Sequence, residues 1–226
     1  MNTVNSPAQE SFLRDVADHQ MIVSHDDGVR RHITFKRLGS SCYAFSLVTW
    51  PGYLAYTGDM GSFMFCRLPD MFDFFRMNPS DWNFNKTGGL SINPGYWAEK
   101  LVSTDRNGGH KKFDPERFKQ VIHEYRLDWV RSDRGRALTK EQRRELWEAA
   151  GDVMNVAEDG YQKAGQAAHD FSYRFDNSKH WFEFTDLFDH NFDRPTYHFV
   201  WCCYALAWGI KQYDAAKANA TLEPAS

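Results

Sequence analysis

Residues 32–76 read HITFKRLGSSCYAFSLVTWPGYLAYTGDMGSFMFCRLPDMFDFFR, a series of short β-type segments separated by Gly, Ser and Pro. Apolar and polar side chains alternate in Ile33-Thr34-Phe35, which is typical of a strand with one buried face. Residues 51–52 (Pro-Gly) interrupt the pattern, because proline has no N–H to donate and glycine tolerates unusual φ angles. Residues 58–61 form a second turn. Residues 32–76 therefore predict antiparallel strands followed by a short aromatic helix.

An Asp-Gly pair at 27–28 lies between two apolar runs and adds a hairpin before this stretch. The whole sheet is expected over residues 21–67, with four or five strands. Helices are expected over residues 69–216. We therefore predict an α+β fold, an N-terminal antiparallel sheet of four to five strands packed against a C-terminal helical layer, in a single domain over residues 1–226.

Within the helical part, residues 139–171 show apolar side chains every three or four positions, which predicts one helix of about 33 residues that glycines could kink or break. Residues 196–216 are apolar nearly all round, so this last helix must be covered by other elements or by a partner chain, which leaves a homodimer open. The tail over residues 217–226 is expected to be disordered.

The bulk composition excludes only extreme classes. A formal charge of −3 and a pI near 6.3 fit neither a DNA-mimicking polyanion nor a cationic nucleic-acid coat. Aromatic residues reach 16%, enough to supply much of the core and some contact surface. Four irregularly spaced cysteines fit a reducing compartment. The apolar run over residues 197–210 is too short for a bilayer span of about 20 residues, so no membrane association is expected.

No catalytic signature frames the titratable residues. His198 and Cys202 could share a metal, but no second ligand pair at usual spacing exists, and a buried structural pair is the favoured interpretation. The turn at residues 58–61 lacks the Lys of a phosphate-binding loop. We therefore expect no catalytic residue, no metal and no cofactor. A hydrolase using residues 180–190, with His180, Glu183 and Asp186 as an acid/base cluster, remains an alternative.

Charge is distributed unevenly along the chain. Residues 106–144 carry twelve Lys or Arg against six acids, a balance of +6, while residues 170–193 have a balance of −4. The basic segment could meet phosphates or an acidic protein, and the acidic segment a basic partner; both could also be solvated faces that partly neutralise each other. A nucleic-acid-binding protein that uses a basic loop at 131–144 is therefore a second alternative. The candidate binding residues are Arg131, Arg134, Arg136, Arg143, Arg144, Asp186 and Asp189.

Several runs within residues 32–76 carry a family resemblance: HITFK, SCY, TWPGYL, GDMG and RLPDMFDFFR. They resemble a family of phage- and prophage-encoded hypothetical proteins, over about a fifth of the chain. The family has no assigned catalytic residues. The resemblance implies a bacteriophage accessory gene, a class that includes inhibitors of host defence such as anti-CRISPR proteins. The leading hypothesis is a non-enzymatic phage protein that binds and inhibits a host defence assembly in the host bacterial cytoplasm.

Overall fold

A computed structural model describes residues 7–76, 89–106, 108–176 and 181–222. The sequence predicts one domain, whereas the contacts within the chain group it into two compact units. Unit 1 comprises Met1–Lys111 and Pro195–Ser226, and unit 2 comprises Lys112–Arg194.

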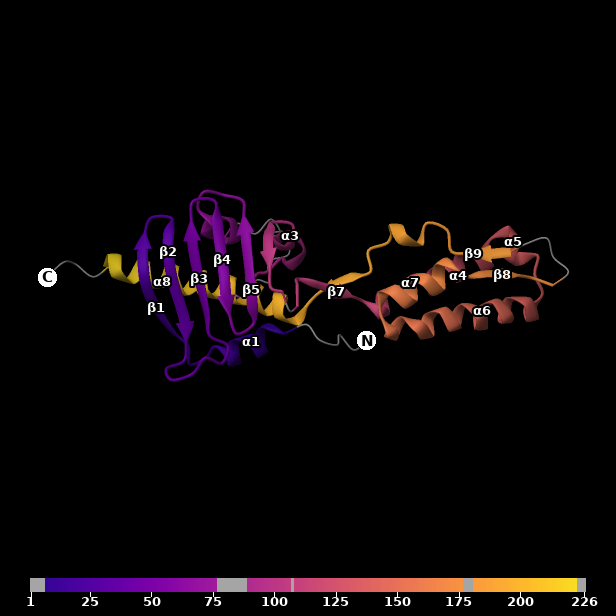
Figure 1. Cartoon of the computed structure of the whole chain (residues 1–226), viewed down its shortest axis with the longest axis horizontal. Helices are drawn as coiled ribbons and strands as arrows, with labels where there is room; N and C mark the ends of the chain where they lie inside the picture. Colours follow the sequence, from indigo (N-terminus) through magenta and orange to yellow (C-terminus); the bar gives the residue numbers. More distant parts are fainter. Residues whose placement is uncertain (1–6, 77–88, 107, 177–180, 223–226) are drawn as a thin grey trace. The chain divides into compact units, whose positions relative to one another are not determined.

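Unit 1 is built on a six-stranded antiparallel sheet in the order β1-β2-β3-β4-β5-β6 (Figure 1). The prediction of an α+β fold is confirmed. The sheet has one strand more than the four or five expected, because β6 follows a helix and is too short to show an alternating pattern. The elements of unit 1 are α1 Gln9–Asp15, β1 Gln20–Asp27, β2 Arg30–Lys36, β3 Phe45–Trp50, β4 Tyr53–Gly58, β5 Gly61–Cys66, α2 Met71–Arg76, α3 Pro94–Ala98, β6 Leu101–Thr104 and α8 Tyr197–Leu222.

The core of unit 1 lies between one face of the sheet and α8, which passes behind the strands in Figure 1. A Cβ built on Gly209 of α8 would lie 3.0 Å from the Phe35 ring and 3.2 Å from Leu47, so the missing side chain lets the helix approach the sheet closely. The helix is covered inside its own unit, and its apolar surface therefore needs no partner chain. The inward-facing sheet residues are Ile33, Phe35, Phe45, Leu47, Leu54, Tyr56, Phe63 and Phe65.

The prediction of disorder from residue 217 is wrong up to Leu222, because α8 continues to that residue. Alanine is the best helix former, and residues 215–220 contain four of them. Lys217 also forms an ion pair with Asp26 of β1, with 2.5 Å between Nζ and Oδ2. The apolar residues on which the helix prediction relied end near residue 216, although the helix itself continues to Leu222.

Unit 2 consists mainly of helices, together with short paired strands. Its elements are α4 Pro115–Arg131, α5 Asp133–Arg136, α6 Lys140–Asn155, the 3-10 helix η2 Val156–Asp159, α7 Tyr161–His169, β8 Ser172–Arg174, β9 Trp181–Glu183 and the 3-10 helix η3 Leu187–Asp189. Strands β7 Lys111–Phe113 and β10 Asp193–Pro195 form a separate two-stranded sheet. The single helix predicted over residues 139–171 is divided, because Gly160 adopts a φ of +103° that ordinary residues avoid.

Candidate binding surfaces

The five candidate arginines lie where α4, α5 and α6 follow one another in unit 2. Arg131 ends α4, Arg134 and Arg136 belong to α5, and Arg143 and Arg144 lie in the first half of α6. Arg143 is half-buried and the other four are exposed. The structure therefore brings these residues onto one short helix–turn–helix segment, which we name the arginine turn (residues 131–144).

The arginine turn has a fixed backbone. The Ser132 hydroxyl accepts the Gly135 N–H at 3.3 Å and donates to the Trp129 carbonyl at 2.5 Å. Gly135 is buried, and a Cβ there would lie 2.4 Å from the Trp129 carbonyl oxygen, so only glycine fits. Leu138 is 6% exposed and packs with Leu146 and the rings of β8–β9. The basic segment is therefore largely helical and not the loop expected from the sequence, and these contacts fix its backbone while Arg131, Arg134, Arg136 and Arg144 remain exposed.

Acidic partners neutralise little of this charge. Arg136 lies 3.7 Å from Asp133 and Arg144 lies 3.5 Å from Glu148, and all four side chains are exposed. Such surface pairs contribute about 0–1 kcal/mol and are screened by salt. In the described part of the chain, no carboxylate forms an ion pair with Arg131, Arg134 or Arg143.

Asp186 and Asp189 are both exposed; Asp186 precedes η3 and Asp189 is its last residue. Burial, and then the charges of these two carboxylates, raises the pKa of Tyr125, whose hydroxyl lies 3.3 Å from His190 Nε2. Among the described residues, neither aspartate hydrogen-bonds to or pairs with an arginine of the turn.

The hydrolase alternative was built on His180, Glu183 and Asp186 as an acid/base cluster. His180 lies outside the described residues, and Glu183 is exposed on β9. The prediction of a buried pair at His198 and Cys202 is wrong, because His198 lies exposed in the first turn of α8 while Cys202 is fully buried. The Cys202 thiol donates to the Met60 carbonyl at 3.5 Å, and burial raises its pKa. No group of three His, Cys, Asp or Glu side chains in the described ranges could hold a metal ion.

The described part of unit 1 has a small cleft of about 180 Å³ beside the β4–β5 turn, and it is lined by Asp59, Asp105 and His198. Asp59 is already engaged, because its carboxylate accepts the Tyr43 N–H at 2.8 Å. Nothing else in its lining identifies a ligand.

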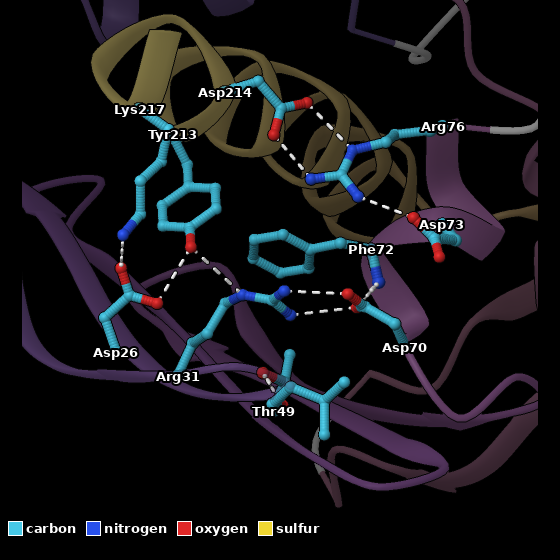
Figure 2. Close-up of polar contacts among 11 residues, drawn as sticks. Asp26, Arg31, Thr49, Asp70, Phe72, Asp73, Arg76, Tyr213, Asp214 and Lys217 are labelled. Carbon is cyan, nitrogen blue, oxygen red and sulfur yellow. Dashed lines mark hydrogen bonds and ion pairs between the residues drawn. The ribbon is translucent and has the colours of Figure 1, made fainter. Parts of the chain in front are cut away.

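Unit 1 contains a partly buried polar network that joins β1, β2, α2 and α8 (Figure 2). Arg31 is 8% exposed and donates two hydrogen bonds to Asp70, at 2.9 and 2.7 Å. Arg31 Nε also donates to the Tyr213 hydroxyl at 3.3 Å, and that hydroxyl donates to Asp26 at 2.9 Å. Lys217 completes the chain at Asp26.

This network, which we name the Arg31 network, holds elements of unit 1 together. Burial alone would raise the pKa of both carboxyls, but hydrogen bonds outweigh it: those from Lys217 and Tyr213 lower the pKa of Asp26, and those from Arg31 and the Phe72 N–H lower the pKa of Asp70. Both stay ionised and each is matched by a cation, so no group in the network is left available for a substrate.

Sequence reasoning missed a surface on the other side of the sheet. Directly paired residues share a face, and the register of β3, β4 and β5 places one set of side chains away from α8. We name this set the outer sheet face. None is charged and none is buried: Ser46, Val48, Trp50, Tyr53, Ala55, Thr57, Ser62, Met64 and Cys66.

The serine and threonine hydroxyl groups of the outer sheet face already have hydrogen-bond partners within unit 1. The Thr57 and Ser62 hydroxyls lie 3.0 Å apart, and Ser46 bonds Thr34 of the next strand at 2.8 Å. Trp50 and Tyr53 stack with ring centroids 5.4 Å apart, and each is 36% exposed. The signal was present in the sequence, because every second residue from 46 to 50 and from 53 to 57 is uncharged, but only the register shows that they lie side by side.

Within the described residues, no helix is both long and apolar enough to cross a bilayer. Comparison with protein-family models, curated proteins and solved structures finds no match to this chain. The fold, the arginine turn and the outer sheet face are therefore the basis for a functional proposal.

Proposed function

We propose that this chain is a non-enzymatic binding protein that docks on a partner protein through the outer sheet face. The observation that carries the proposal is the lack of charge across three adjacent strands. The centres of protein interfaces are depleted of charged residues and enriched in Trp, Tyr and Met, and Trp50, Tyr53 and Met64 lie on this face.

Covering this face costs little in lost hydrogen bonds. A buried polar group without a partner costs about 1–3 kcal/mol, whereas the hydroxyls of Thr57 and Ser62 satisfy each other before any partner arrives. Single exposed apolar residues are normal on a protein surface, but a contiguous patch marks an interaction site.

The partner we propose is a bacterial host defence assembly, with the chain acting as its inhibitor in the host cytoplasm. The support is the resemblance of residues 32–76 to phage-encoded accessory proteins. Those same residues include β3, β4 and β5 and therefore the entire outer sheet face.

The test compares one charge placed on the face with the same charge placed elsewhere in unit 1. Val48→Glu lies at the middle of β3 on the outer sheet face, and Gln212→Glu lies on the exposed side of α8. The wild-type chain, expressed in bacteria with an active CRISPR system, should raise the plating efficiency of a targeted phage and should capture a component of that system. Val48→Glu should lose both effects, and Gln212→Glu should keep them.

Circular dichroism should show that both variants fold. Unchanged plating with the wild-type chain across several defence systems would remove the host-defence partner. Full activity of a folded Val48→Glu variant would remove the outer sheet face from the proposal.

A further inference from the structure

Arg126 of α4 is a buried arginine without an acidic partner among the described residues. It is 5% exposed, and its guanidinium donates to His123 Nδ1 at 2.8 Å and to the Trp147 carbonyl at 3.0 Å. One acceptor is an imidazole nitrogen and the other a backbone carbonyl oxygen, so neither is a carboxylate. Burial lowers the pKa of Arg126. Buried charges are usually paired, so this one leaves positive potential uncompensated at this part of unit 2.

The ring that Arg126 covers is also a surface group. The guanidinium carbon lies 3.3 Å from the Trp147 ring centroid, and His123 meets the same ring edge-on at 4.9 Å. Trp147 nevertheless remains 38% exposed. It lies on α6 four residues after Arg143 and three after Arg144, positions that are neighbours on a helix surface. An accessible indole is thus bordered by two arginines and backed by a third.

The arginine turn continues this positive surface. Residues 131–144 carry six cations against two acids, a balance of +4. The turn is fixed by Gly135 and Leu138, so its arginines are presented without a loop having to be ordered on binding. The six cations are Arg131, Arg134, Arg136, Lys140, Arg143 and Arg144.

We propose that the arginine turn and Trp147 together bind single-stranded nucleic acid, with phosphates at the arginines and a base stacked on the indole. Non-specific single-strand sites combine these two features, a positive surface along the backbone and an aromatic side chain for a base. An acidic protein would also compensate the charge, but a single-stranded nucleic acid supplies both phosphates for the arginines and flat bases that can stack on the indole. This inference is independent of the outer sheet face, because it concerns unit 2 alone.

The experiment titrates the full chain into a fluorescent single-stranded oligonucleotide of 20 nucleotides at several salt concentrations. Each phosphate contact contributes about −0.7 to the slope of log K against log salt for single strands. The triple variant Arg131→Gln, Arg134→Gln, Arg136→Gln should bind more weakly, with a slope shallower by about 2. Lys163→Gln, an exposed lysine of α7 in the same unit, is the control and should leave the slope unchanged.

The stacking contact has its own variant. Trp147→Ala should weaken binding roughly 5- to 150-fold with little change of slope, since a base–aromatic stack is worth about 1–3 kcal/mol. Trp147→Phe keeps a ring and should recover part of the loss. Tyr161→Ala removes another exposed ring of unit 2 and should have no effect.

Several results would overturn the proposal. Binding that does not depend on salt would exclude the arginine turn, and so would an unchanged slope in the triple variant. Equal binding of Trp147→Ala and wild type would exclude stacking. Polyglutamate competing as well as the oligonucleotide does would show that the surface recognises an acidic protein instead.

Discussion

The ion pair between Arg31 and Asp70 fastens α2 to the sheet, and replacing Arg31 by Met tests how much stability it supplies. The variant keeps most of the aliphatic stem and removes the guanidinium. Asp70 then loses both charge-assisted hydrogen bonds and keeps only the Phe72 N–H, at 2.9 Å. The cation–π contact of Arg31 with Phe72, 4.6 Å from the ring centroid, is lost as well.

Removing one partner of a fully buried pair costs about 3–5 kcal/mol. The Asp70 side chain is 18% exposed, so water compensates part of its charge and the lower end of the range applies. We expect Arg31→Met to destabilise unit 1 by about 3 kcal/mol. At 1.36 kcal/mol per factor of ten, this corresponds to roughly 150-fold faster amide exchange by opening of the core strands.

Hydrogen exchange of β2 and β3 peptides, measured by mass spectrometry, reports on unit 1 separately from unit 2. Arg30→Met is the matched control, because Arg30 is an exposed arginine on the same strand, and its change should stay within about 0.5 kcal/mol. Asp70→Asn keeps an oxygen for the Phe72 N–H but removes the charge, so adding it to Arg31→Met should recover part of the loss. A cost below about 1 kcal/mol for Arg31→Met, or strict additivity of the two changes, would refute the reasoning.

Three further predictions concern pH, glycine and cysteine. The pKa values of Asp26 and Asp70 are lowered in the folded state, so their contribution to stability is complete above about pH 5 and is lost as the pH falls below about 4, through the folded pKa values. Acid titration monitored by circular dichroism should show a smaller loss of stability on acidification when both residues are replaced by Asn. Gly135→Ala should destabilise unit 2 by about 1–3 kcal/mol, since its Cβ would meet backbone atoms, whereas Gly151→Ala, which meets nothing within 4 Å, should stabilise it by up to about 1 kcal/mol; thermal melts that reverse this order would contradict the structure. The two adjacent cysteines of α8, whose pKa burial raises, should resist alkylation at pH 8 while exposed Cys42 reacts, and mass spectrometry that finds all of them labelled equally in the folded chain would contradict their burial.

Local sequence signals located the strands. Alternation and the Asp-Gly and Gly-Asp-Met-Gly turns were sufficient for β2 to β5, because each strand is specified by its own residues and its nearest turn. In the structure, Thr139 and Gln142 form a capping box at the start of α6, and this feature is likewise local because the two residues are only three positions apart. The sequence also identified the arginine turn, since a cluster of charges within 14 residues needs no tertiary information.

Only the tertiary structure shows which residues from distant segments of the chain lie together. The outer sheet face depends on the register of three strands. The Arg31 network depends on the contacts of Arg31 with Asp70 and with Tyr213, and Tyr213 lies 182 residues from Arg31 along the chain. The same is true of Arg126 and Trp147, whose contact joins two helices. Periodicity reports which side of an element is buried, but the free energy of packing is determined by partners that the local pattern does not contain.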